Sequence, residues 1–306
     1  MACDNATAMD TRAFIGLEPT HNRFRWKLPV TRGISTPGDF MFGGVGLAAA
    51  ISAMEGTSGR PCVWATAQYL AYARPGQIVD IDVRLAVEGN QITQARAVCH
   101  VADTEILTVN AALGAREFDR SGQWERMPLD VPPPESCGRR PRNMIVAGTI
   151  SDRLDERLAV GRSFDELDGT EGSGRTLMWA RIPDLVGPLD AAGLAVLGDF
   201  VPMGVGQALG IRGGGNSLDN TLRIVDLGPG HFGSDGWVLL DITVQAVARG
   251  FGHGLIQMYA EDGTLLATAS QSCIVRYWSE AADRLDPSRA GDQDPATNDA
   301  AGRDNE

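Results

Sequence analysis

The residues best suited to nucleophilic or metal chemistry are widely spaced along this 306-residue chain. The cysteines form no CxxC pair and no two histidines lie close together; they are Cys3, Cys62, Cys99, Cys137, Cys273, His21, His100, His231 and His253. Spacings of this kind predict neither a zinc site nor a disulfide framework. They indicate reduced, mostly buried thiols and histidines that serve in the core or at the surface.

Motifs for phosphate binding and for a serine nucleophile are missing from the sequence as well. Lys27 is the only lysine and lies in Trp-Lys-Leu, so it cannot complete a Walker A loop. Residues 228–233, GPGHFG, match GxGxxG, but the SDGWVLLD that follows is typical of a turn and a strand, whereas dinucleotide binding needs a helix there. No serine lies in a GxSxG elbow, which argues against an α/β-hydrolase.

Two aspartates, Asp39 and Asp199, stand near the start of a pair of matching Gly-rich segments. Residues 38–51 read GDFMFGGVGLAAAI and residues 198–211 read GDFVPMGVGQALGI, with eight identities in fourteen positions at a constant spacing of 160. A repeat of this length indicates an internal duplication. The two halves are therefore expected to pair about a pseudo-twofold axis, as two subunits of a dimer would.

Each Gly-rich segment leads into the same series of elements. In the first half, LAAAISAMEG predicts a helix of about three turns that ends at Gly56, and in the second half glycines from Gly210 onward shorten the helix. Short runs of alternating β-branched residues follow in both halves, with Asp103 and Asp262 at equivalent hairpin turns. The predicted fold class is α+β, with an antiparallel sheet wrapped around a central helix in each half.

The composition divides the chain into five parts. Residues 1–13 and 279–306 contain few large apolar side chains and are expected to be flexible, the second as a disordered acidic tail. Residues 121–145 include VPPPESCGRRPR and are expected to form an exposed Pro/Arg-rich linker between domains at 14–120 and 146–278.

Charge and hydropathy define the expected setting of the protein. The formal net charge is −12, which disfavours binding to a nucleic-acid backbone. No basic start followed by an apolar run marks a secretory signal, and no apolar stretch approaches the roughly 20 residues of a membrane span. We therefore expect a soluble, cytoplasmic protein with no nucleic-acid partner and no membrane span.

In the order and spacing of its motifs, the chain resembles the acyl-CoA thioesterase II family, whose members carry two fused hotdog domains. The likeness is greatest at residues 248–276, ARGFGHGLIQMYAEDGTLLATASQSCIVR. In the N-terminal half, FGG at 42–44, RPG at 74–76 and EGN at 88–90 are similar to the family's FGG, RPG and DGN signatures. The resemblance covers most of both predicted domains and implies a tandem, or double, hotdog fold.

The resemblance also implies the chemistry. Family members hydrolyse acyl-CoA to a free acid and CoA, with no metal or other cofactor, through a water that an Asp, a Thr or Ser, and a Gln hold. The matching positions are Asp199 in LGDF, Ser217 in NSLDN and Gln271 in TASQS. The N–H group of Gly43 or Gly44 is expected to polarise the thioester oxygen. The alternative interpretation makes the aspartate a helix N-cap and the other two ordinary strand residues.

The internal repeat tests how many such sites the chain contains. Asp39 matches the implied base, Thr66 matches the serine at a shorter spacing, and Ala112 matches the glutamine. By this alignment the first half keeps an aspartate and a hydroxyl but lacks the amide. We therefore expect one active site per chain, with the N-terminal half serving as scaffold and pocket wall.

Departures from the family pattern keep other functions open. Asn220 takes the place of a family histidine, and LRIVDLGPGHFGSDG stands where the family has a His-Arg-Pro stretch. One alternative is a non-catalytic acyl-CoA-binding hotdog protein, and another is an enoyl-CoA hydratase-like hotdog enzyme, which would rely on an Asp–His pair. The expected partner is an acyl-CoA of lipid metabolism, and the resemblance implies a homo-oligomer. The acyl chain, the choice between CoA and acyl-carrier-protein thioesters, and the arginines that bind the CoA phosphates (Arg74, Arg212 or Arg249) stay open.

Overall fold

The structure, a computed structural model, describes residues 9–140, 147–185, 189–228 and 236–277. The helices are α1 (Thr11–Ile15), η1 (Arg32–Ile34), α2 (Gly43–Ser58), η2 (Pro134–Ser136), α3 (Ile150–Arg153), η3 (Phe164–Glu166), α4 (Ala191–Leu197) and α5 (Val201–Leu209). The strands are β1 (Glu18–Pro19), β2 (Arg25–Pro29), β3 (Cys62–Tyr69), β4 (Ile78–Glu88), β5 (Ile92–Val101), β6 (Thr104–Gly114), β7 (Gly138–Arg139), β8 (Asp155–Val160), β9 (Arg175–Arg181), β10 (Gly213–Ile224), β11 (Val238–Ala248), β12 (Phe251–Ala260) and β13 (Leu265–Tyr277).

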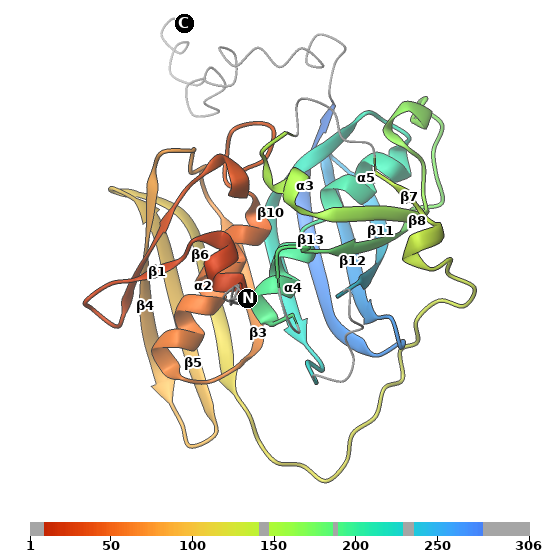
Figure 1. The fold of residues 1–306 in the computed structure, drawn as a ribbon. Coiled ribbons are helices and arrows are strands. Elements are labelled where there is room, and N and C mark those ends of the chain that lie inside the picture. The colour runs from red at the N-terminus through yellow and green to blue at the C-terminus, as the bar shows by residue number, and fades with distance from the viewer. Residues whose placement is uncertain (1–8, 141–146, 186–188, 229–235, 278–306) are drawn as a thin grey trace, which may run out of the picture.

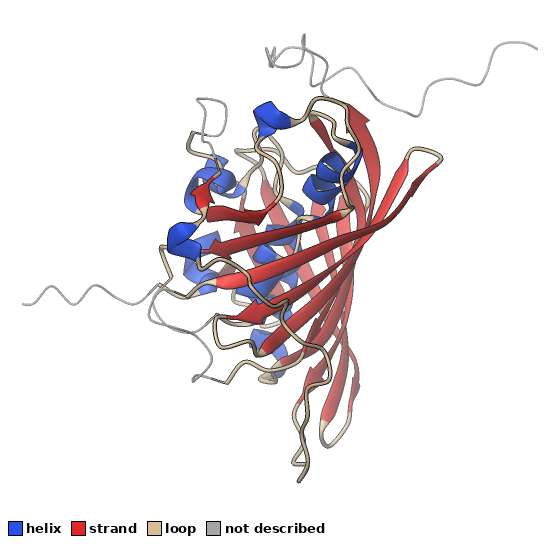
Figure 2. Cartoon of the chain, turned by 90° about the vertical axis from the view of Figure 1, so that its right-hand side faces the viewer, coloured by secondary structure: helices blue, strands red, loops and turns tan. Residues whose placement is uncertain are grey.

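The strands of the described chain form one continuous antiparallel sheet. Its order is β1-β2-β4-β5-β6-β3-β10-β13-β12-β11-β9-β8-β7, so the two halves of the chain lie side by side (Figure 1). The succession β2-β4-β5-β6-β3 in the first half recurs in reverse as β10-β13-β12-β11-β9 in the second. Figure 2 shows the helices gathered on one face of the sheet. This arrangement confirms the α+β class and the tandem hotdog plan, with a sheet wrapped around a helix in each half.

The two halves meet where β3 pairs with β10. Thr66 and Thr221 are directly opposite each other in this pairing, and their hydroxyl oxygens lie 2.6 Å apart. Each of these strands also has a β-bulge on its opposite edge. The bulge of β3 is at Val63, in the pairing with β6, and the bulge of β10 is at Leu218, in the pairing with β13. The matching bulges place a pseudo-twofold axis at the threonine pair, whose members are 155 residues apart in the chain.

The central helix of the N-terminal half, α2, is apolar on nearly all sides because protein surrounds it. Its buried residues include Leu47, Ile51 and Met54, which pack under the sheet, while its N-terminal turn approaches α4. The expected end at Gly56 is wrong: the helix continues to Ser58 and Gly59 closes it with a left-handed φ of 69°. Gly56 instead makes room for the indole of Trp26, which a Cβ there would approach to 2.6 Å.

The central helix of the C-terminal half is interrupted. α4 ends before Gly198, and α5 begins at Val201 with Pro202 in its first turn, where the missing N–H costs nothing. Gly210 closes α5 at a φ of 66°, which confirms the predicted shortening. The expectation that no apolar stretch approaches the length of a membrane span is wrong for Ala191–Leu209, which is long and apolar enough by length and composition. Of its apolar window, 72% is buried inside the protein, as is typical of a core helix.

The stretch expected as a linker crosses the outer face of the C-terminal half. A second cluster of buried side chains, separate from the main core, lies on this face and would be exposed to solvent without the stretch. It includes Trp179, Trp237 and Tyr259. Backbone carbonyls of the stretch accept hydrogen bonds from Trp179 Nε1 and Tyr259 Oη, at 2.8 Å and 3.1 Å. At the other end of the chain, α1 begins at Thr11, inside the expected flexible terminus. The expected tail at 279–306 lies outside the described residues.

Candidate active site

Asp199 occupies the break between α4 and α5, where its side chain is only 5% exposed. Its Oδ1 accepts hydrogen bonds from Ser217 Oγ at 3.0 Å and from Gln271 Nε2. Its Oδ2 accepts the backbone N–H of Gly44 at 2.7 Å. The N-cap interpretation is wrong for this residue, because Phe200 is the N-cap of α5 and the Asp199 carboxylate receives no bond from that helix.

Two neighbouring strands bring the other implied residues to the carboxylate. Ser217 on β10 pairs across with Cys273, and Gln271 on β13 pairs with Asn220, so all four belong to one patch of the sheet. Gln271 Nε2 donates to Ser217 Oγ at 2.7 Å as well as to the aspartate, while its Oε1 accepts Val201 N–H at 3.3 Å. The structure thus places the three residues implied by the resemblance in mutual contact.

The N-terminal half completes the site through the start of α2. The Gly44 N–H that was a candidate for the thioester oxygen is occupied by the Asp199 carboxylate. The carbonyl of Gly43 accepts a hydrogen bond from Tyr69 Oη at 2.9 Å. A Cβ at Gly43 would lie 2.7 Å from the carboxylate, so glycine is required for this close approach. The site therefore lies between the two halves, a location that neither half of the sequence defines alone.

The environment sets the protonation of the groups in the site. Burial raises the pKa of Asp199 to about 6, against the three hydrogen bonds, which favour the carboxylate. At neutral pH the group is therefore mostly ionised and basic enough to accept a proton. Burial also raises the pKa of the nearby Cys273 to about 11, so this side chain stays a thiol and is a poor nucleophile.

Asn220 and Tyr69 are parts of the site that sequence reasoning did not assign. Asn220 is 1% exposed, and its Nδ2 donates to the carbonyl of Gly198, one residue before the aspartate. This bond satisfies a carbonyl left free where α4 ends. Tyr69 stands on β3 with its hydroxyl inside the site. Strand alternation places both on the helix side of the sheet. For Asn220 the sequence offered a second signal, the family histidine whose place it takes.

The register of the strands corrects two equivalences expected from the repeat. Since Thr66 matches Thr221 across the axis, Ser217 corresponds to Cys62, and Thr66 lies on the outer side of the sheet. Since β6 pairs with β3 as β13 pairs with β10, Gln271 corresponds to Ala111 instead of Ala112. The first half therefore lacks both the hydroxyl and the amide.

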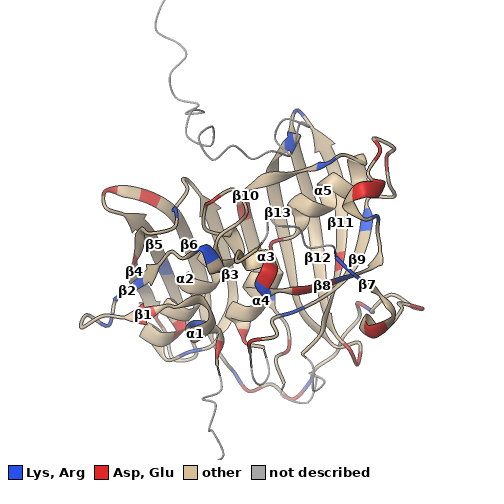
Figure 3. Ribbon diagram, turned by 45° about the horizontal axis from the view of Figure 1, so that its top comes forward, with Lys and Arg blue, Asp and Glu red and all other residues tan. Residues whose placement is uncertain are grey.

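Other candidate groups lie elsewhere in the described chain. His100 contacts Asp82 at 3.0 Å and His253 contacts Ser272 at 3.1 Å, both away from Asp199, while the GxGxxG stretch from residue 229 and His231 fall outside the described residues. Within the described residues, His, Cys, Asp and Glu side chains form no group of three that could hold a metal. Figure 3 shows Lys and Arg dispersed over both halves.

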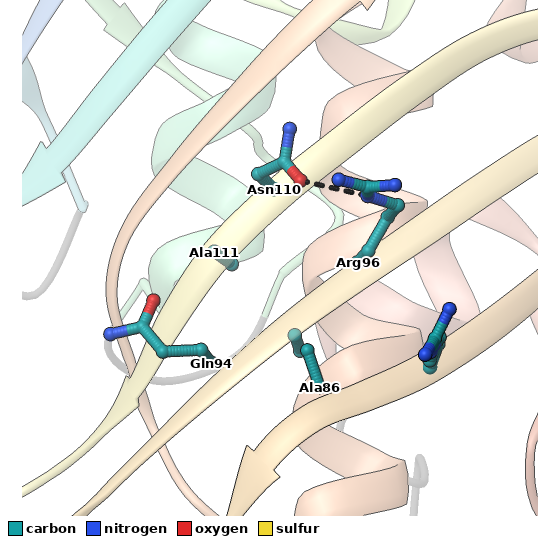
Figure 4. A pocket seen from close by; sticks show the side chains of 7 residues that line it. Ala86, Gln94, Arg96, Asn110 and Ala111 are labelled. Carbon is teal, nitrogen blue, oxygen red and sulfur yellow. Dashed lines mark hydrogen bonds between the residues drawn. The ribbon is translucent and has the colours of Figure 1, made fainter.

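A hollow of about 330 Å³ opens on the outer face of the N-terminal sheet. Figure 4 shows Arg96 and Asn110 there, joined by a hydrogen bond of 3.1 Å, on strands whose other face carries the helices. None of the residues implied for catalysis lines it. The hollow is thus separate from the candidate active site.

Comparisons with known proteins agree with the fold. Residues 125–275 match a family model described as acyl-CoA thioesterase C-terminal domain. A proposed thioesterase from Novosphingobium aromaticivorans is 31% identical, with a TM-score of 0.72 over 84% of this chain and 98% of that one. A hot dog protein from Alicyclobacillus acidocaldarius is 20% identical (TM-score 0.75; 87% and 97% covered), and an acyl-CoA thioesterase II from Mycobacterium marinum is 18% identical (TM-score 0.66; 89% and 99% covered). No curated protein matches the chain in sequence.

Proposed function

The chain belongs to the acyl-CoA thioesterase II family, and from this premise we propose that it is a thioester hydrolase in which Asp199 activates a water to attack an acyl-CoA. One observation carries the proposal: a buried carboxylate receives a serine hydroxyl, a glutamine amide and a helix N–H at the junction of the two halves. An arrangement of this kind holds a base in one orientation and keeps it ionised near neutral pH.

The hydrogen bonds indicate where the water binds. Both lone pairs of Asp199 Oδ1 are used, one by Ser217 and one by Gln271, whereas Oδ2 accepts one hydrogen bond from the part of the chain that the structure describes, that of the Gly44 N–H. The serine hydrogen and both amide hydrogens are also engaged. We therefore assign the water to the second lone pair of Oδ2. Ser217 and Gln271 act on the carboxylate, and reach the water through it.

Hydrolysis of the thioester proceeds from this water in two steps. The water oxygen bonds to the acyl carbon as Asp199 takes one water proton, which leaves a tetrahedral oxyanion. The oxyanion collapses, the carbon–sulfur bond breaks, and the aspartic acid returns its proton to the departing thiolate. The products are a free carboxylic acid and CoA, and the carboxylate is regenerated.

The start of α2 is the proposed place for the thioester oxygen. Gly44 N–H is engaged with Asp199, so Gly43 N–H is the proposed donor. Gly43 is only partly buried, and the N-terminus of a 16-residue helix favours negative charge beside it. Removing one donor to an oxyanion typically slows an enzyme by about 10²–10³.

The alternatives raised by the sequence fit this site less well. An acyl-CoA-binding protein without activity would not need a buried carboxylate that accepts three hydrogen bonds. A hydratase of the Asp–His type would need a histidine, and the buried residue at the relevant position is Asn220. Hydrolysis is the function that the side chains in contact support best.

The test is release of free CoA from a panel of short, long, branched and aromatic acyl-CoAs. Wild type and Asp199→Asn are assayed side by side, each checked for folding by circular dichroism. Turnover by the wild type with loss of at least about 10³ in the variant supports the proposal. A folded variant with full activity would show that another group is the base.

A further inference from the structure

One peptide unit at the start of α2 is held on both of its polar groups. Its N–H, that of Gly44, donates to Asp199 Oδ2 at 2.7 Å. Its carbonyl, that of Gly43, accepts from Tyr69 Oη at 2.9 Å. The hydroxyl of a residue on β3, in the N-terminal half, is thus linked to the carboxylate of the C-terminal half through a single amide.

We propose that Tyr69 is a positioning residue for thioester hydrolysis, which holds and polarises the Gly43–Gly44 peptide as a donor to Asp199. The inference rests on the proposed function and adds a residue to it. A hydrogen bond to an amide oxygen strengthens the N–H of the same amide as a donor, because chains of hydrogen bonds polarise one another. The hydroxyl also limits rotation of the peptide at two glycines, which have little steric restraint of their own.

The chemistry of the tyrosine suits a permanent donor. Burial raises the pKa of Tyr69 well above its usual value, and the negative charge of Asp199 raises it further. The phenol therefore stays protonated throughout the range in which the carboxyl titrates. Its ring also packs against Gly43: a Cβ added at Gly43 would lie 3.2 Å from the tyrosine ring.

The groups around Asp199 allow its titration to be followed. Tyr69 faces it from β3, Cys273 lies on β13, and α2 offers the uncharged Gly44 N–H. Asp219 on β10 acts electrostatically on Tyr69 and on Cys273. The phenol and the thiol both have raised pKa values. The side chain of Asp219 accepts a hydrogen bond from the N–H of its strand partner Ser272 at 2.8 Å. The acidic limb of the rate profile is therefore expected to report Asp199.

The experiment compares Tyr69→Phe with wild type, in kcat and KM from pH 5 to 8, on the best acyl-CoA of the panel. The variant keeps the ring and loses only the hydroxyl. We expect kcat to fall about fivefold to tenfold, as for loss of one hydrogen bond, with KM within about twofold. We also expect the acidic limb to move upward by roughly half a pH unit, because the carboxylate loses part of its stabilisation.

Tyr72→Phe is the matched control. Tyr72 is 52% exposed and its hydroxyl contacts Asn216 at the surface, so its removal is expected to leave both kcat and the limb unchanged. A Tyr69→Phe enzyme with wild-type kcat and wild-type limb would overturn the proposal and leave the residue a packing role. Activity that survives Asp199→Asn would instead overturn the proposed function, so the two failures are distinguishable.

A second variant covers the case in which Tyr69→Phe folds poorly. Site-specific 3-fluorotyrosine at position 69 keeps the hydroxyl and makes the phenol a stronger donor. We expect the acidic limb to move in the opposite direction, toward lower pH. No movement in a folded, active protein would contradict the polarisation of the peptide by Tyr69.

Discussion

Equivalent positions in the two halves of the molecule differ in what they offer to a substrate. In the C-terminal half an aspartate is buried between a serine and a glutamine. At the matching positions of the N-terminal half, Cys62 and Ala111 offer no comparable donors, and Asp39 is 48% exposed and paired with Arg32 at 2.9 Å. The scaffold is shared, so it does not make a site by itself. We propose that the burial of a carboxylate together with its hydrogen-bond donors makes the site in the C-terminal half.

The aspartates provide the largest test of this difference. Asp199→Asn removes the proposed base and is expected to lower kcat/KM by at least about 10³. Asp39→Asn makes the same change where the side chain is half exposed and paired with Arg32, so its activity is expected to stay within about twofold of wild type. Release of CoA by both variants measures the contrast. Equal losses would mean that the halves are functionally alike.

Gln271→Ala gives the C-terminal half the residue that the N-terminal half has at Ala111. The Asp199 carboxylate loses one donor, and the Ser217 oxygen loses the amide that donates to it, so kcat is expected to fall about 10- to 100-fold. The control is Gln68→Ala, at an exposed glutamine on β3, which is expected to leave kcat unchanged. A Gln271→Ala variant with wild-type kcat would show that the amide is not needed to orient the base.

The pH dependence should reflect the burial that separates Asp199 from Asp39. Hydrolysis requires the ionised form, so kcat/KM is expected to rise about tenfold per unit below pH 6 and to level off above it. Steady-state rates from pH 4.5 to 8 measure this limb. If the rise in kcat/KM had its midpoint near pH 4 instead, the carboxylate would be solvated in the working enzyme.

The same raised pKa has a consequence for folding with a defined sign. The folded group holds its proton more tightly than the unfolded one, so it contributes stability below about pH 4 that is lost as the pH rises through about 6. Between these values the free energy of unfolding of the wild type is expected to fall by about 2 kcal/mol relative to Asp199→Asn. Urea unfolding of both proteins at several pH values measures it.

Much of this architecture was predictable from local patterns, and the exceptions have physical causes. The repeat and the strand alternation predicted both halves, and the resemblance led to Asp199, Ser217 and Gln271. The end of α2 was misplaced because Gly56 serves the packing of Trp26 and does not end the helix. The match of Ser217 was wrong because the helix-to-strand spacing differs between the halves: Ser217 and Cys62 are 155 residues apart, whereas the Gly-rich repeat has a spacing of 160. The match of Gln271 was wrong by one residue because it followed the spacing of 159 between the hairpin residues Asp103 and Asp262, whereas the repeat's spacing of 160 leads to Ala111. Tyr69 was missed because its role depends on contact with a distant segment.

The threonine pair at the junction gives the smallest and most symmetric test. Thr66 and Thr221 face each other on the pseudo-twofold axis, with their oxygens 2.6 Å apart. Thr66→Val and Thr221→Val each remove one hydroxyl from the same partly buried hydrogen bond. We expect each to lower the free energy of unfolding by about 1 kcal/mol, and by similar amounts.

The double variant then isolates the interaction. Since each single change already breaks the bond, the double change is expected to cost less than the sum of the two. Urea unfolding midpoints of the four proteins complete the cycle, and CoA release should stay unchanged because both hydroxyls lie outside the site. Unequal single costs would show that the halves diverge even on their common axis, whereas strict additivity would show that the two hydroxyls do not stabilise each other.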